Sequence, residues 1–232
     1  MAEALYLLPG WGLDVQLLAP LADALRPAFD VTLLALPAAP GLDEGLQALH
    51  AGIPEGAWLG GWSLGGMLAV ALAARRGARC PGVVTLASNA CFTAREQWPE
   101  AMATATFEAF LSGSQQSPAA TLKRFSLLCS QGSEQPRELA RQLTAAPGEV
   151  SAHGLRWLAA LDNRQALAAY RGRQLHLFGG ADALVPAAAA QAVAALAPDA
   201  HVVLLAQACH AFAVQAPHTV ASKIIDWSPA HG

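Results

Sequence analysis

Residues 59–67 read LGGWSLGGM, a stretch in which four glycines surround a single serine, Ser63. The apolar run AWLGG leads into it and the helix-forming run MLAVALAARR follows from Met67. Its centre, residues 61–65, fits the pattern G-x-S-x-G, in which the serine occupies a strained turn between a strand and a helix. Side chains two residues before and after that serine would collide with neighbouring backbone, and glycine removes the collision. The stretch therefore predicts a turn that presents the Ser63 hydroxyl above the carboxyl ends of parallel strands.

Similar apolar runs recur on both sides of this turn and alternate with segments of helical character. The runs predicted to be buried strands are ALYLLP, DVTLLAL, AWLGGW, GVVTLAS, QLHLFGG and HVVLLAQ. The helices predicted between and after them cover residues 15–27, 42–51, 64–76, 187–197 and 216–227, with Pro186 in the first turn of the fourth. This alternation predicts an α/β fold, a mostly parallel sheet of about six strands with helices on both faces.

The alternation stops between about Thr93 and Asn163, where the sequence is more polar and has no convincing strand. Several helix-like pieces occur there, and one begins near Ser133 and Pro136. The simplest arrangement is a core made of residues 1–92 and 163–232. The helical insertion, residues 93–162, is then expected to form a cap or lid at one edge of the sheet.

Composition narrows the class of protein. A chain of 232 residues with 54% hydrophobic and 13% charged residues suits one domain with a large core. The apolar runs are too short to span a bilayer, and the N-terminus lacks the basic leader of a secretory signal. The four cysteines include no CxxC pair, and the net charge of −3 argues against nucleic acid as a partner. We therefore expect a cytoplasmic, monomeric protein with reduced thiols and no membrane segment.

A serine hydroxyl attacks a substrate only when a base removes its proton, and a third group must hold that base. In this type of fold the partners follow the serine as Asp or Glu and then His, in loops after later strands. Asp182 follows the run QLHLFGG, and His210 follows HVVLLAQ. Asp162 is a rival acid, although bonding to nearby backbone or to Arg164 is its commoner role. The sequence thus predicts a triad of Ser63, Asp182 and His210 that needs no metal or organic cofactor.

Acyl transfer also needs two N–H groups aimed at the developing oxyanion. Leu64, directly after the serine, is expected to supply one of them. The second is expected from Trp11 in the glycine-rich turn at residues 8–12, after the first strand. Taken alone, this turn is equally well explained as a strand-to-loop turn with a core tryptophan.

Five stretches together give the chain a wider resemblance. They are PGWGL, GWSLGG, TLASNACFTAREQWP, GADALVP and ACHAF, of which the third is the most specific. Over nearly its whole length the chain resembles the pimeloyl-acyl carrier protein methyl ester esterases of biotin synthesis, members of the α/β-hydrolase superfamily. The resemblance implies a serine esterase that removes the methyl group from a pimeloyl chain attached to acyl carrier protein.

The resemblance also implies roles for particular residues. The triad would be the one given above, with Trp11 and Leu64 at the oxyanion and Phe125 lining the acyl channel. Two positions depart from the family pattern. Pro9 stands where the family often has His, and Cys129 stands where a polar residue is often found near the substrate.

Other functions remain open at this stage. The natural substrate could be a short-chain ester of another kind, hydrolysed by a carboxylesterase of broad specificity, or the acyl group could pass to an acceptor other than water. A non-catalytic ligand-binding member of the same fold would be expected to lack a triad residue, and none is missing here. Dehalogenase chemistry would need Asp at position 63, where this chain has Ser.

The predicted insertion carries an excess of positive charge. Residues 120–145 have a local charge of +2, whereas the rest of the chain carries −5. The basic residues there are Lys123, Arg124, Arg137 and Arg141. Arg137 and Arg141 are four apart on a predicted helix and so share one face. An ordinary solvated helix face would explain them, but the resemblance implies that they dock an acidic acyl carrier protein beside the acyl channel.

Overall fold

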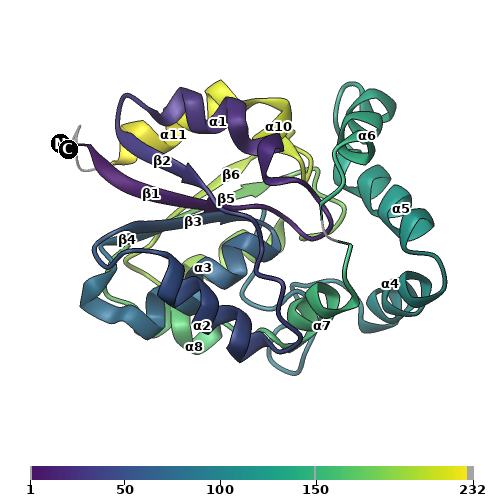
Figure 1. The fold of residues 1–232 in the computed structure, drawn as a ribbon, viewed down its shortest axis with the longest axis horizontal. Coiled ribbons are helices and arrows are strands. Elements are labelled where there is room, and N and C mark those ends of the chain that lie inside the picture. The colour runs from purple at the N-terminus through teal and green to yellow at the C-terminus, as the bar shows by residue number, and fades with distance from the viewer. Residues whose placement is uncertain (1, 149, 229–232) are drawn as a thin grey trace.

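A six-stranded sheet forms the centre of the molecule in the computed structural model, which describes residues 2–148 and 150–228 (Figure 1). The strand order is β2-β1-β3-β4-β5-β6, and every pairing is parallel. The strands are β1 (Glu3–Leu8), β2 (Phe29–Leu33), β3 (Trp58–Trp62), β4 (Gly82–Leu86), β5 (Arg173–Gly179) and β6 (His201–Leu205). All six predicted strands are therefore confirmed, as is the parallel sheet.

Helices cover both faces of this sheet (Figure 1). One face carries η1 (Val15–Leu18), α1 (Ala19–Leu25), α10 (Phe212–Gln215) and α11 (Pro217–Trp227). The other carries α2 (Leu42–Gly52), α3 (Leu64–Arg76), the short turn η2 (Gly77–Arg79), α8 (Arg164–Ala169) and α9 (Ala188–Leu196). Because β3 and β4 are covered on both sides, every residue in them is buried, which is why they read as continuous apolar runs.

Two predicted helix starts differ from the structure. The helix predicted over residues 15–27 opens as the 3₁₀ turn η1, capped by the Asp14 side chain, and becomes α-helical only at Ala19. Pro20, which has no N–H to donate, sits in the first turn of α1, where that loss costs nothing. Pro186 lies before α9, which begins at Ala188, so it is not in the first turn as predicted.

Between β4 and β5, the described residues form four helices ahead of α8. They are α4 (Thr104–Gln116), α5 (Pro118–Ser130), α6 (Pro136–Ala145) and α7 (Ala152–Ala160), here called the cap helices. They lie beyond the carboxyl ends of the strands (Figure 1). The two ends of the segment meet, since Cys91 forms an isolated bridge with Asp162 and the Asn163 N–H donates to the Ala90 carbonyl at 2.8 Å. The start of α6 at Pro136 agrees with the prediction.

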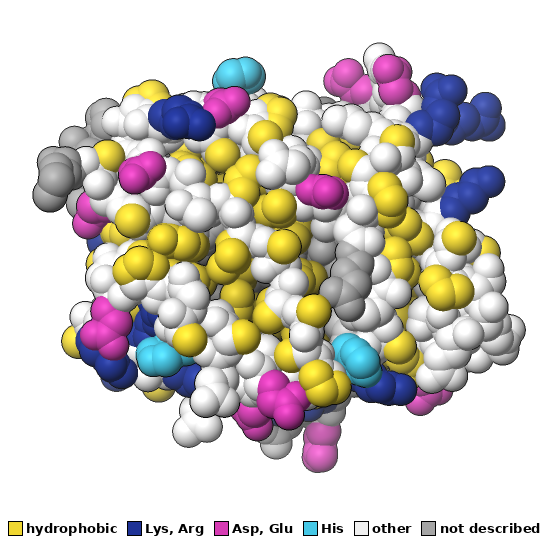
Figure 2. Space-filling view, viewed as in Figure 1, with side chains coloured by type: hydrophobic (Ala, Val, Ile, Leu, Met, Phe, Trp, Pro, Cys, Tyr) yellow, Lys and Arg dark blue, Asp and Glu magenta, His cyan; other side chains and the backbone are white. Residues whose placement is uncertain are grey.

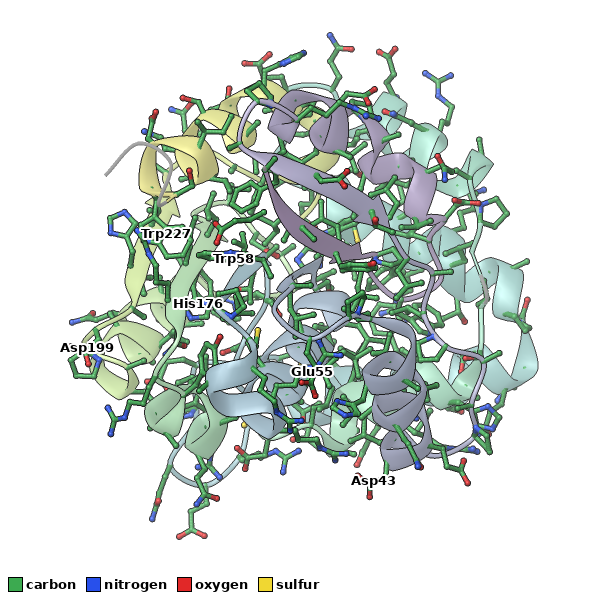
Figure 3. The ribbon with its side chains drawn as sticks, turned by 60° about the vertical axis from the view of Figure 1, so that its left-hand side comes forward. Asp43, Glu55, Trp58, His176, Asp199 and Trp227 are labelled. Atoms are coloured by element: carbon green, nitrogen blue, oxygen red, sulfur yellow. The ribbon has the colours of Figure 1, made fainter. Side chains whose placement is uncertain are left out.

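Aromatic side chains close the opposite, amino-terminal end of the sheet. Trp58, at the start of β3, packs edge-on against Phe29 at 5.7 Å and against Trp227 at 5.6 Å between ring centroids. Figure 3 shows Trp58 and Trp227 at this end, with His176 on β5, which is separated from β3 by β4. This end is thus filled by packed rings, which leaves the carboxyl ends of the strands to the site.

His176, on β5, is buried, and its charge state affects the free energy of unfolding. Its Nδ1 lies 2.7 Å from the Thr85 hydroxyl on β4, and its Nε2 lies 3.2 Å from the Gln174 side-chain oxygen. Burial lowers the pKa of His176 from 6.5 to about 4, because the imidazolium form would lose its hydration. Between these two values the unfolded chain binds a proton that the folded chain does not.

The free energy of unfolding is therefore expected to fall as the pH drops from about 6.5 to about 4, by on the order of 3 kcal/mol from this group alone. The His176→Gln variant should lose that part of the pH dependence in urea titrations across the same range. His201→Gln is the matched control, because His201 is exposed on β6 and stays in water in both states. Equal pH dependence in wild type and His176→Gln would contradict the assignment.

Candidate active site

Ser63 occupies the sharp turn between β3 and α3. Its backbone has φ 55° and ψ −117°, a strained conformation for a residue with a side chain. A Cβ atom at Gly61 would overlap the Gly65 backbone, and one at Gly65 would overlap the carbonyl of Leu8 on β1. The two glycines that flank the serine are therefore required by close backbone approach, as the sequence pattern predicts.

Asp182 and His210 lie in the loops after β5 and β6 and form a fully buried pair. Asp182 Oδ2 is 2.7 Å from His210 Nδ1, and both side chains are 0% exposed. The other carboxylate oxygen accepts the backbone N–H groups of Leu184 and Val185 at 2.8 and 2.9 Å. This carboxylate therefore holds the proton on Nδ1 and leaves the lone pair on Nε2.

The histidine loop lies directly beside the serine turn. The indole N–H of Trp62, the residue before Ser63, donates to the His210 carbonyl at 2.9 Å. The Ser63 hydroxyl and His210 Nε2 are both buried, and neither has a hydrogen-bond partner among the described residues. The Ser63 hydroxyl and His210 Nε2 thus lie on two loops that contact each other, and neither group is bonded to a third residue that is described.

Asp162 lies elsewhere, at the base of the cap helices. Its carboxylate pairs with Arg164 at 2.7 and 2.9 Å and accepts a weaker bond from the Cys91 thiol at 3.3 Å. The hydrogen bonds from Arg164 hold the pKa of Asp162 well below its usual value. The structure thus pairs Asp162 with an arginine, and it is Asp182 that contacts His210.

The two residues predicted to supply oxyanion N–H groups, Trp11 and Leu64, belong to segments that adjoin the serine turn. A Cβ atom at Gly10 would lie 3.5 Å from the Ser63 Cβ, so the turn after β1 runs beside the serine. Leu64 begins α3, and N–H groups at a helix start attract negative charge. Within residues 2–148 and 150–228, the N–H groups of Trp11 and Leu64 donate to no backbone or side-chain acceptor. Pro9 supplies no side-chain donor here, and its carbonyl lies against Gly65.

An apolar pocket lies between the sheet and the cap helices. Phe125 of α5 packs edge-on against Trp11 at 5.3 Å and against His210 at 6.4 Å between ring centroids. The pocket is lined by Phe92, Met102, Phe107, Phe110, Phe125, Leu155, Leu158 and Leu184. Its free space is only about 10 Å³, roughly room for one water molecule. A ligand larger than a water molecule would fit in this pocket only if these side chains moved apart.

Cys129 is fully buried on α5, one helical turn from Phe125, and is not among the residues lining that pocket. Its carbonyl accepts the Ala211 N–H at 3.0 Å, so its backbone contacts the histidine loop. Burial, together with the nearby charge of Asp182, raises the pKa of the Cys129 thiol well above its usual value. All four cysteines are free and buried.

The basic residues of α5 and α6 do not all face the same way. Lys123, Arg137 and Arg141 line a surface groove of about 680 Å³. Leu127, which is 48% exposed, forms part of its apolar wall. Figure 2 shows Lys and Arg side chains gathered at this end of the molecule. Arg124 instead lies 4.9 Å above the Phe110 ring, on the side toward α4.

Sequence reasoning missed some residues that support the site. The Ser88 hydroxyl donates to the Ser63 carbonyl at 2.8 Å, and Asn163 donates to the Met67 carbonyl at 2.9 Å. Trp62 fills the unspecified position before the serine in the G-x-S-x-G pattern, and no local signal marks Ser88. Among the described residues, no group of three His, Cys, Asp or Glu side chains is placed to hold a metal ion, and no helix is long and apolar enough to cross a bilayer.

This fold and this arrangement of residues define an α/β hydrolase. The sequence profile of the alpha/beta hydrolase fold matches residues 47–217. A bromoperoxidase from Bacillus anthracis has the same fold, with a TM-score of 0.81 and 19% identity over 96% of this chain and 89% of that one.

Relatives with assigned names identify the family within the α/β hydrolases. A pimeloyl-[acyl-carrier protein] methyl ester esterase from Aromatoleum aromaticum is 34% identical, with 96% of each chain covered. A biotin biosynthesis bifunctional protein from Cellvibrio japonicus is 39% identical over 96% of this chain but only 47% of its own length. The chain thus spans about half the length of such bifunctional relatives. It belongs to the family of pimeloyl-[acyl-carrier protein] methyl ester esterases.

Proposed function

We propose that this chain is a serine esterase that hydrolyses the methyl ester of a pimeloyl chain bound to acyl carrier protein, releasing methanol. The observation that carries the proposal is the buried Asp182–His210 pair, 2.7 Å apart, beside Ser63 in its strained turn. The names of the relatives support the choice of substrate. The proposed location is the cytoplasm, the proposed state a monomer, and no cofactor enters the reaction.

In the first half of the proposed reaction, His210 Nε2 takes the proton of the Ser63 hydroxyl, and the serine oxygen attacks the ester carbonyl. The N–H groups of Trp11 and Leu64 stabilise the resulting oxyanion. As the carbonyl reforms, the C–O bond to the methyl group's oxygen breaks. His210 returns the proton to that oxygen, so methanol leaves and an acyl-serine ester remains.

The second half repeats the sequence with water. His210 removes a proton from the water, whose oxygen attacks the acyl-serine carbonyl, and the same two N–H groups stabilise the oxyanion. The Ser63 oxygen leaves with the proton from His210, and the free acid is released. Asp182 takes up no proton in either half and stabilises the His210 imidazolium that forms in each.

We further propose that residues 93–162 act as a lid on a core of residues 1–92 and 163–232. Phe125 would line the acyl channel, because its ring lies between Trp11 and His210. Cys129 would contribute through its backbone contact with the histidine loop. Opening the lid would be needed to admit the chain, because the pocket behind Phe125 is nearly closed.

The groove between α5 and α6 is the proposed docking site for the carrier protein. Lys123, Arg137 and Arg141 surround it, and Leu127 offers an apolar contact. Arg124 would add to the positive field at the edge, since its guanidinium lies over Phe110. Attraction between exposed charges raises the encounter rate and is screened over about 8 Å at physiological ionic strength.

The test compares kcat/KM for pimeloyl methyl ester on acyl carrier protein with that for a free pimeloyl methyl ester. We expect the carrier-bound ester to be preferred. Changing Arg137 and Arg141 together to Glu should raise its KM by about tenfold or more and flatten its salt dependence, through lost electrostatic steering. Free methyl esters should be hydrolysed as before.

The matched control changes Arg75 and Arg79 to Glu, which alters the net charge equally at exposed sites away from the groove. It should leave both substrates unaffected. Equal losses on carrier-bound and free esters in the groove variant would indicate a damaged lid and contradict the docking proposal. A preference of the wild type for small free esters would instead favour a short-chain carboxylesterase, the alternative suggested by the nearly closed pocket.

A further inference from the structure

The turn that carries Trp11 is bound to the segment between α6 and α7. The Asp14 N–H donates to the Ala146 carbonyl at 3.1 Å, and the Gly148 N–H donates to the Gly12 carbonyl at 3.0 Å. Leu13 forms an isolated antiparallel bridge with residue 147 between these bonds. The backbone on the carboxyl side of Trp11 is therefore fixed by residues that lie more than a hundred positions later in the chain.

The side chain of Trp11 is held by the same part of the cap. Its indole N–H donates to the Ser151 carbonyl at 2.8 Å, and the side chain is fully buried. Gly154 lies against the ring, since a Cβ atom there would be 2.6 Å from Trp11 Cδ1. The same Cβ would be 3.6 Å from a methyl carbon of Leu64. Gly154 thus lies beside the side chains of both residues that are proposed to supply the oxyanion N–H groups.

Gly154 itself is held firmly. It lies in the first turn of α7, and its N–H donates to the hydroxyl of the capping Ser151 at 3.2 Å. The same Ser151 accepts the indole N–H at its backbone carbonyl. Backbone at the start of α7 therefore fixes the Trp11 ring by one hydrogen bond and one close contact.

We propose that Gly154 and the Ser151 carbonyl are positioning groups for the oxyanion hole. They set the place of the Trp11 ring and, through it, of the Trp11 backbone N–H. This inference rests on the proposed function, in which that N–H stabilises the oxyanion. A donor is effective only within about 2.7–3.1 Å of the oxyanion, so a displacement of a few tenths of an ångström matters. A methyl group at position 154 would overlap the indole, so the Trp11 ring and the start of α7 must move apart.

The test is the Gly154→Ala variant, assayed with a free p-nitrophenyl ester. We expect kcat to fall by about 10- to 100-fold, because one oxyanion donor is displaced, while KM changes by less than about threefold. A trifluoromethyl ketone, which forms a tetrahedral adduct at the serine, should bind more weakly by the same factor as kcat/KM falls. The Trp11→Phe variant, which keeps a ring but removes the indole donor, should show the same pattern to a smaller extent.

The matched control is Gly113→Ala on α4, where the added methyl group meets only the Thr121 hydroxyl at 3.1 Å. It should keep wild-type kcat. The proposal is overturned if folded Gly154→Ala protein keeps its kcat, or if its activity falls while the ketone binds as tightly as before. Because the substrate is a free ester, a lack of preference for the carrier-bound ester would count against the proposed function and leave this inference intact.

Discussion

Replacing Ser63 with alanine is expected to lower kcat for ester hydrolysis by about 10⁵- to 10⁶-fold, because no other group can form the covalent intermediate. The variant should fold normally. Alanine has a Cβ like serine and meets the same backbone strain at φ 55°, and the serine hydroxyl that it removes makes no hydrogen bond to the described residues. Fluorophosphonate labelling should give one adduct per wild-type chain and none in the variant.

Ser130→Ala serves as the control, since Ser130 is a buried serine whose hydroxyl is already bonded to the Leu127 carbonyl at 3.0 Å. It should be labelled at the wild-type rate. Labelling that persists in folded Ser63→Ala protein, located by peptide mass spectrometry at another residue, would remove Ser63 from the proposed mechanism.

The parts of the fold that the sequence predicts are those set by local patterns. Each strand is an apolar run of the length that a buried parallel strand requires, and all six are found in the sheet. The turn at Ser63 is predictable because a side chain at Gly61 would overlap the backbone only a few residues away. The overlap at Gly65 differs, because it involves the carbonyl of the distant Leu8. The start of α6 is marked by Pro136, a residue that favours the first turn of a helix.

The parts that the sequence does not predict depend on contacts between distant segments. Helix α8 has only six residues, too few to show a periodic pattern, and is fixed by its packing on α3 and α9. From the sequence alone, Gly154 is an unfavourable residue for a helix. The structure explains the glycine, because the Trp11 ring leaves no room for a side chain at this position. The different surroundings of Arg124, over the Phe110 ring, and of Arg137, in the groove, likewise follow from where α4 and α6 lie.

The choice between two aspartates shows the same limit within the site. Asp162 and Asp182 both lie between Ser63 and His210 in the chain, Asp162 just before the chain re-enters the sheet and Asp182 in the loop after a predicted strand. Only the fold shows that Asp162 is held by Arg164, whereas Asp182 lies 2.7 Å from His210. The chain order Ser, Asp, His admits both residues, and Asp182 is favoured because it directly follows a predicted strand. The two residues therefore make a paired experiment.

Asp182→Asn is expected to lower kcat by about 10³- to 10⁴-fold with little change in KM. One side-chain oxygen must still accept the N–H groups of Leu184 and Val185, so the new amide NH₂ turns toward His210 Nδ1. An NH₂ group donates, so the imidazole must accept at Nδ1 and carry its proton on Nε2. In that tautomer Nε2 cannot take the proton of Ser63, even though the geometry is kept.

Asp162→Asn is the matched control, the same chemical change at the other aspartate. It removes the ion pair with Arg164. The side chains of Asp162 and Arg164 are both about 30% exposed, so the free energy of unfolding should fall by about 1 kcal/mol or less. Its kcat should stay close to that of the wild type, because Asp162 bonds to Arg164 and the Cys91 thiol rather than to His210. Steady-state kinetics and urea unfolding of both variants decide the matter. If Asp162→Asn loses turnover while Asp182→Asn keeps it, the acid of the proposed triad is Asp162, and the Asp182–His210 contact is structural.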